Sequence, residues 1–223
     1  MMKCKTFLSS SIGQKFLVAI TGLGLSGFVL AHMSGNLLLF VSADAYNLYG
    51  HKLTSTPLIY VAEVGLILFF LTHLVFTMKL TRENRISRPV APHQLPSNPV
   101  KRASFASRTM ALSGLMVLSF VVLHLITFKF GTYYETEVDG VKMRDLYRLV
   151  NEWFQKEWYT AFYCVCMVIL FSHLSHGFSA AFQSLGLQSR HNQTLQRLGY
   201  AFAAIVGGGF FCQPLYMYFW GGN

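Results

Sequence analysis

Long apolar stretches separated by polar segments dominate the pattern of residues along this chain. A helix needs about 20 mostly apolar residues to cross a hydrocarbon core about 30 Å thick. Five stretches meet this length, and they predict membrane-spanning helices at roughly 15–41, 57–80, 108–130, 157–183 and 195–220. We therefore expect an all-α membrane protein that forms one transmembrane domain over residues 1–223, with four of its helices in a bundle.

The segments between these stretches carry signals of turns and loops. The linker 81–107 contains four prolines and is predicted to be a loop. An Asp139-Gly140 pair marks a turn, and the stretch 141–154 after it is predicted to form a short helix at the membrane surface. The first apolar run, 16–41, is too long for a cleaved signal peptide, so we expect it to stay as a span. We identify no second domain and no internal repeat.

Composition and charge agree with a membrane protein and give its orientation. Apolar residues make up 53% of the chain and charged residues only 12%, against about 25% charged in average soluble domains. Positive charge is concentrated on one side of the predicted spans. That side comprises the N-terminus, the linkers 81–107 and 184–194 and their helix ends, and it carries twelve Lys or Arg and one acidic residue. The opposite side carries six Lys or Arg and seven acidic residues. The positive-inside rule therefore predicts a cytoplasmic N-terminus and an outer C-terminus. The basic residues show no aromatic interleaving on a soluble domain, which argues against nucleic-acid binding.

Four histidines lie inside four different predicted spans: His32, His73, His124 and His176. An ionisable side chain inside a bilayer is costly, so such a set indicates function. Counted at 1.5 Å per residue, His32 and His124 fall in the outer half of the membrane and His73 and His176 in the inner half, about 15 Å apart in depth. Two pairs at two depths are expected where two b-type haems stack across a membrane, each held by two imidazoles.

The fourth histidine helix offers two candidate ligands. His173 and His176 are three residues apart, so both lie near one helix face. We favour His176, because the adjacent Gly177 would leave space for a ring plane, and keep His173 as the alternative. Other small residues beside the histidines would leave similar space or would serve ordinary helix packing; they include Gly24, Gly27, Ala31, Gly35, Gly65, Gly114 and Ala180. Three arginines could pair with haem propionates or could reflect topology alone, namely Arg82, Arg102 and Arg108.

Beyond the histidines, short motifs lie along most of the chain: SIGQK at 11–15, TG at 21–22, HMSGNL at 32–37, DAYNLY at 44–49, HLSHGF at 173–178 and QSLG at 183–186. With these motifs, over roughly residues 9–220, the chain resembles the cytochrome b558-type membrane subunit of bacterial succinate dehydrogenase and fumarate reductase. The resemblance implies a five-helix subunit of the bacterial inner membrane that holds two haems b. A flavoprotein with covalent FAD and an iron–sulfur protein would dock on its cytoplasmic face.

The resemblance also implies roles for particular residues. His73 and His176 would hold the haem proximal to the iron–sulfur partner, and His32 and His124 the distal haem. Electrons would pass between that partner and a membrane quinone, for which we expect menaquinone. The intramembrane Glu63 is our first candidate for quinone proton exchange, and Asp44, Asn47 and His51 lie at the same outer end. Glu63 could instead bond a neighbouring helix, and a quinone site near Ser11 or Gln14 stays open.

Two other functions compete with this prediction. The first is a haem b anchor of another membrane oxidoreductase, such as formate dehydrogenase, hydrogenase or nitrate reductase. The second is a transporter whose histidines relay protons, which would favour broken helices that meet at the midplane. The predicted spans are mostly unbroken, and Pro214 is the only proline deep within one. We expect no catalytic residue for dicarboxylate chemistry, since the chain has no flavin motif and no cysteine-rich cluster motif.

Overall fold

Five long helices form the body of the protein. The computed structural model describes residues 10–87, 105–187 and 192–221. The long helices are α1 (Ser11–Asn36), α3 (Leu58–Ile86), α4 (Phe105–His124), α6 (Glu157–Ser184) and α7 (Asn192–Trp220). Each is long and apolar enough to cross a membrane. The prediction of an all-α protein with five membrane spans is confirmed.

The helix bounds differ slightly from those that the apolar runs predict. The α1 helix begins earlier because the Ser10 side chain caps it, accepting a hydrogen bond from the Gly13 amide at 3.1 Å. It continues as a 3₁₀ turn over Leu37–Phe40, and α4 continues as a π-helical turn over Leu125–Lys129. The α3 helix extends to Ile86 because the polar residues that follow its apolar run contain no helix breaker before that point. Pro214 lies inside α7, as expected.

One short element was not predicted, and another corrects the prediction. Helix α2 (Ala43–Thr54), capped by Ser42, forms between the first two spans, where the sequence analysis names no element. The expected surface helix over 141–154 is only partly present, because residues Val141–Arg144 form strand β2 and pair with β1 (Glu135–Val138). Asp139 and Gly140 both have positive φ, which is the geometry of a tight hairpin turn. Helix α5 therefore spans only Leu146–Phe154.

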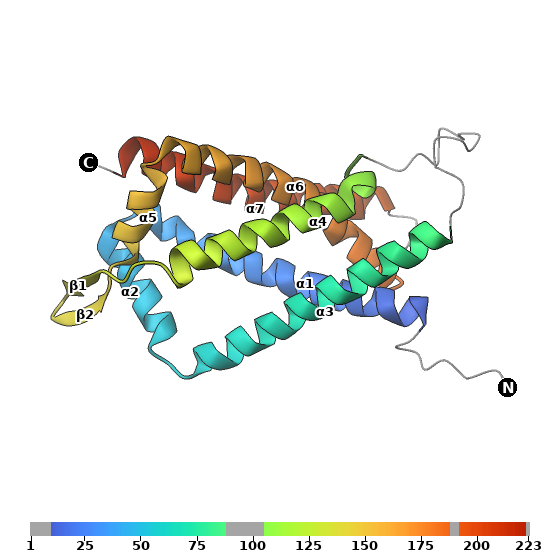
Figure 1. The fold of residues 1–223 in the computed structure, drawn as a ribbon, viewed down its shortest axis with the longest axis horizontal. Coiled ribbons are helices and arrows are strands. Elements are labelled where there is room, and N and C mark those ends of the chain that lie inside the picture. Colours follow the sequence, from blue (N-terminus) through green and yellow to red (C-terminus); the bar gives the residue numbers. More distant parts are fainter. Residues whose placement is uncertain (1–9, 88–104, 188–191, 222–223) are drawn as a thin grey trace.

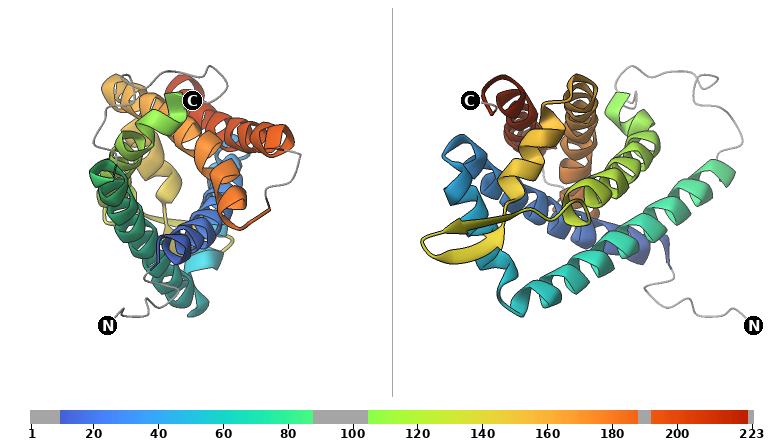
Figure 2. Two further views of the ribbon diagram at one scale, coloured as in Figure 1. Left: turned by 90° about the vertical axis from the view of Figure 1, so that its right-hand side faces the viewer. Right: turned by 60° about the vertical axis from the view of Figure 1, so that its left-hand side comes forward.

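The long helices run along one axis, and the short elements close one end (Figure 1). Helices α6 and α7 pack closely along their length, while α1 contacts both α3 and α6. Viewed down the bundle, the long helices surround a common axis (Figure 2). The most apolar 18-residue stretch of α3 contains no buried residue, whereas a third of the residues in the corresponding stretches of α6 and α7 are buried. The α3 helix thus presents an apolar surface suited to lipid.

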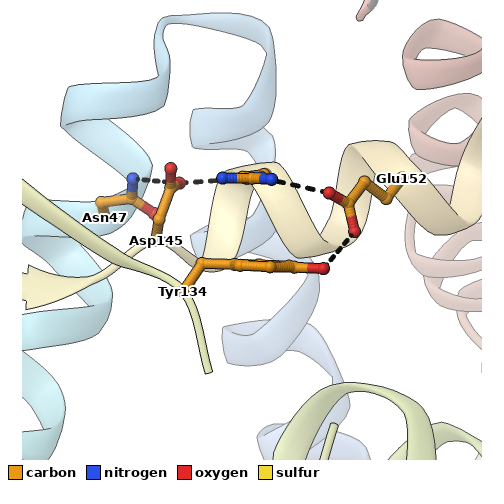
Figure 3. Close-up of polar contacts among 5 residues, drawn as sticks. Asn47, Tyr134, Asp145 and Glu152 are labelled. Carbon is orange, nitrogen blue, oxygen red and sulfur yellow. Dashed lines mark hydrogen bonds and ion pairs between the residues drawn. The ribbon is translucent and has the colours of Figure 1, made fainter. Parts of the chain in front are cut away.

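Helices α2 and α5 and the hairpin form a polar cap over that end, which we call the outer end. The Asn47 amide donates to the Asp145 carboxylate and accepts from the Tyr147 backbone amide, both at 2.9 Å. Glu152 accepts hydrogen bonds from the Tyr134 hydroxyl at 2.8 Å and the Arg148 guanidinium at 3.1 Å (Figure 3). These two donors, the tyrosine foremost, hold the pKa of Glu152 below its ordinary value. The cap is therefore cross-linked by side chains from separate elements.

Candidate haem-binding site

Five histidines lie on four helices of the bundle, and all are half-buried. His32 is on α1, His73 on α3 and His124 at the end of α4, while His173 and His176 are both on α6. Their arrangement resolves into an outer level near the cap and an inner level further along the bundle. The two levels differ in what surrounds the imidazoles.

At the outer level, His32 and His124 face each other. Their ring centroids are 5.8 Å apart, with ring planes 84° from parallel. Two imidazoles that bind opposite sides of one metal ion, with metal–nitrogen bonds of about 2 Å, place their ring centres about 6 Å apart. Phe28 stacks on His32 and Phe120 packs on His124, each from one helical turn earlier. The spacing and packing of this pair fit two imidazoles that would hold one metal ion between them.

Each outer imidazole also has a polar neighbour. The His124 Nδ1 lies 3.1 Å from the Tyr163 hydroxyl, to which the Tyr159 hydroxyl donates at 3.2 Å. The His32 Nε2 lies 3.4 Å from the Asn36 amide nitrogen, and the Tyr46 hydroxyl donates to the Asn36 amide oxygen at 2.8 Å. A contact of the nitrogen that does not bind a metal fixes the orientation of a ligand ring, and the Tyr163 hydroxyl can serve His124 in this way. The Asn36 amide instead donates toward the His32 Nε2 and occupies the lone pair that a metal would need at that nitrogen.

At the inner level, the His73 imidazole lies against a hydroxyl and a glycine of α1. Its Nδ1 is 3.4 Å from the Thr21 hydroxyl, and a Cβ on Gly22 would lie only 3.2 Å from its Cε1. The Thr21 hydroxyl donates its own proton to the Leu17 carbonyl at 2.7 Å. Its oxygen is therefore free to accept from Nδ1–H, and this tautomer leaves the Nε2 lone pair available for a metal.

His173 repeats this arrangement against α4. Its Nδ1 is 3.2 Å from the Ser113 hydroxyl, which donates to the Met110 carbonyl at 3.0 Å, and a Cβ on Gly114 would lie 3.3 Å from its Cε1. The same tautomer follows, with Nε2 available. The imidazole of His173 also interacts electrostatically with that of His73. The structure thus brings His173, the alternative of the sequence analysis, into the environment that matches His73.

His176 has a different environment. Its imidazole makes no hydrogen bond within the part of the chain that the structure describes. The space beside Gly177, which we expected to receive a ring plane, faces the Met110 methyl group, since a Cβ there would lie 3.1 Å from it. The Met110 side chain therefore already lines the space that we expected to receive a ring plane.

The matched contacts reveal an internal repeat, which corrects the sequence analysis. Residues 21–32 of α1 align with 113–124 of α4 without a gap, and five of the twelve positions are identical: Gly22/Gly114, Leu23/Leu115, Phe28/Phe120, Val29/Val121 and His32/His124. Likewise Thr72-His73-Leu74 of α3 aligns with Ser172-His173-Leu174 of α6. The repeat makes His173 the counterpart of His73. This similarity in the sequence favours His173 over His176.

The repeat also sets the separation of the two levels. On each of α1 and α4, the glycine that faces the inner histidine precedes the outer histidine by ten residues, or about 15 Å of helix. Two histidines are too few to hold a bare metal ion, and no group of three or more metal-binding side chains occurs among the described residues. The donor set therefore fits a metal whose remaining ligands come from a macrocycle, as in haem.

The predicted quinone-binding residues lie at the outer end but are not joined to one another. Glu63 on α3 is half-buried and forms an ion pair with Lys129 beyond α4. Asp44 is exposed and His51 half-buried on α2, while the buried Asn47 is engaged with the cap. No hydrogen bond or ion pair connects Glu63 to these α2 residues in the described part of the chain.

At the opposite end, the structure places some of the predicted residues and not others. Arg82 lies in the last turns of α3. Arg102 lies outside the described residues, as does the side chain of Arg108. Gln14 is buried near the start of α1, and Ser11 is exposed.

The chain therefore combines five apolar helices with histidines at two levels of the bundle. Comparison of the chain with protein-family models, curated proteins and solved structures found no match. The functional conclusion accordingly rests on the site itself and on the resemblance described above.

Proposed function

We propose that this chain is the dihaem cytochrome b membrane subunit of a succinate dehydrogenase or fumarate reductase, which carries electrons between an iron–sulfur subunit and membrane quinone. The observation that carries the proposal is the pair of histidine levels, with ring centroids 5.8 Å apart at the outer level and matched hydroxyl contacts at the inner level. The catalytic site for the dicarboxylate belongs, in this proposal, to the flavoprotein partner.

The ligands follow from the geometry of each level. His32 and His124 would hold the outer haem. His73 and His173 would hold the inner haem, because each has a neighbouring glycine and a hydroxyl oxygen that can accept from Nδ1–H, which would leave Nε2 for the metal. His176 stays as the competing inner ligand to be tested.

Bound haem supplies reversible one-electron chemistry at its iron, and the surrounding protein sets the potential. The residues of this chain hold and shield it. Thr21 and Ser113 orient the inner imidazoles, and Phe28 and Phe120 pack on the outer ones. The buried aromatic cluster beneath the cap excludes water from the outer level; its core is Leu39, Tyr46, Phe128, Leu149, Val150, Phe154, Tyr159, Tyr163 and Met217.

The charge distribution supports docking of soluble partners at the inner end. Arg82 and Arg85 project from the last turns of α3, at the end that the positive-inside rule places in the cytoplasm. The iron–sulfur subunit would bind there, within electron-transfer reach of the inner level, and the flavoprotein would bind behind it. Quinone would exchange protons at the outer end, where Glu63 and Lys129 form the ion pair between α3 and α4.

The first experiment is a reduced-minus-oxidised spectrum of the purified complex, with haem quantified per chain as the pyridine haemochrome. Two low-spin haems b per chain are expected. One haem would contradict the two-level arrangement, and none would overturn the proposal in favour of the histidine-relay transporter.

A second experiment separates this enzyme from other haem b anchors. Succinate added to the oxidised complex in the presence of its soluble partners should reduce the haems, whereas formate or hydrogen should not. Reduction by formate or hydrogen alone would assign the chain to a different oxidoreductase.

A further inference from the structure

Two buried tyrosines connect the outer level to the aromatic cluster. Tyr159 and Tyr163 are one turn apart on α6, with 4% and 6% of their surface exposed and ring centroids 4.8 Å apart. Phe128 and Phe154 pack on both rings. The hydroxyl of Tyr163 is thus held rigidly 3.1 Å from the His124 Nδ1.

The direction of this hydrogen bond follows from ligation. If the Tyr163 hydroxyl donated to Nδ1, the proton of the neutral imidazole would sit on Nε2, and that nitrogen could not bind a metal. A ligating His124 must therefore donate Nδ1–H to the Tyr163 oxygen. This oxygen also accepts from the Tyr159 hydroxyl at 3.2 Å, so two donors share one buried acceptor.

The other three candidate ligands lack such a phenol. His73 and His173 meet aliphatic hydroxyls that donate onward to backbone carbonyls. His32 meets the Asn36 amide nitrogen, which is a donor and cannot accept. His124 is therefore distinguished by a tyrosine contact within a dry aromatic cluster, where a hydrogen bond has a stronger electrostatic effect than in water.

We propose that Tyr163 is a positioning residue that lowers the reduction potential of the outer haem by accepting the Nδ1–H bond of His124, with Tyr159 controlling how strongly it accepts. An imidazole that donates Nδ1–H is a more basic ligand, and a more basic ligand favours the oxidised iron. The inference rests on the proposed function, because it needs His124 to bind haem.

The test is a redox titration of both haems in the full complex, followed by absorbance. Tyr163→Phe should raise the potential of the outer haem and leave that of the inner haem unchanged. We expect the ratio of reduced to oxidised outer haem at a fixed potential to change about tenfold. A tenfold change corresponds to a shift of 59 mV in the reduction potential of a one-electron couple. Tyr159→Phe should shift the outer haem in the opposite direction and by less, because the Tyr163 oxygen then accepts from His124 alone.

The matched control is Tyr147→Phe, which removes a phenol from the same end of the protein without touching a histidine and should change neither potential. Two haems with an unchanged outer potential in Tyr163→Phe would overturn the inference and leave the proposed function intact. If Tyr163→Phe loses the outer haem, an unchanged potential in Tyr159→Phe would overturn it. Absence of haem from the unmodified complex would instead remove the proposed function.

Discussion

The inner and outer histidine levels use the same repeated helix segments but surround their imidazoles differently. At the inner level, a threonine or serine followed by glycine receives a histidine from the neighbouring antiparallel helix. At the outer level, the histidines end the repeated segments themselves, and phenylalanines from the preceding turn pack on both. The inner level is thus built from two matched halves, whereas the outer level depends on the cap and on α7.

The difference shows how a repeated pattern yields two unlike sites. The inner imidazoles have near-identical contacts, so we expect similar ligand properties there. After the outer histidines the halves diverge: His32 is followed one turn later by Asn36 and contacts Phe210 of α7, while His124 is followed by Phe128 and contacts Tyr163. Unequal surroundings would give the two haems unequal potentials.

The largest expected effect is loss of one haem when an outer ligand is removed. His32→Ala or His124→Ala should abolish the outer haem and keep the inner one, because the two levels share no ligand. Haem quantification with low-temperature spectra measures this. Loss of both haems from either variant, with the helix content unchanged by circular dichroism, would show that the levels are not independent.

Nearly as large is the expected contrast between the two histidines of α6. His173→Ala should remove the inner haem and weaken attachment of the soluble subunits, whereas His176→Ala should keep two haems, because its imidazole lacks the hydroxyl contact of His173. The haem content of the two purified variants decides between them. The reverse result would restore the assignment favoured by the sequence argument.

A smaller effect is expected from the hydroxyls of the inner level. Thr21→Val keeps the shape of the side chain but removes the acceptor for the His73 Nδ1–H. Loss of such a contact costs about 10–100-fold in metal affinity, and haem retention during dilution or extraction would measure it. Thr54→Val, which removes a hydroxyl that bonds backbone carbonyls of α2 and no histidine side chain, is the control. Equal retention in wild type and Thr21→Val would mean that the hydroxyl does not support the ligand.

The smallest effect concerns the cap that covers the outer level alone. Because the pKa of Glu152 is lowered in the folded state, its carboxylate stabilises that state above the ordinary carboxyl pKa, and this contribution is lost as the pH falls through the lowered value. The stability difference between wild type and Glu152→Gln should thus be present at pH 7 and shrink on acidification, by thermal melting. A difference that grew at low pH would contradict the assigned direction.

Much of the architecture was predictable because the bilayer imposes a length and an apolar composition on each span. The five helices and the unbroken path of α7 around Pro214 followed from that constraint. The short elements followed only in part. The Asp139-Gly140 turn and the helix over Leu146–Phe154 were expected, whereas α2 was not, because it is too short and too polar to be a span, and neither were the two short strands, which pair with each other.

The candidate site was predictable in kind and less so in detail. Histidines inside apolar spans indicate cofactor binding from sequence alone, and their depths follow from helix rise. The choice between His173 and His176 stays a prediction, since both lie near one face of α6. The repeat that favours His173 is short and degenerate, and it is supported by the equivalent imidazoles that lie against Gly22 and Gly114.

The sequence by itself determined the number of spans, the side on which positive charge gathers and the presence of histidines at two depths, because each of these depends on position along a single helix. The tertiary structure alone decided which imidazoles face each other, which hydroxyls lie beside the inner imidazoles and that Tyr163 reaches His124. Such contacts join residues tens of positions apart, and they depend on how the helices rotate and cross when they pack.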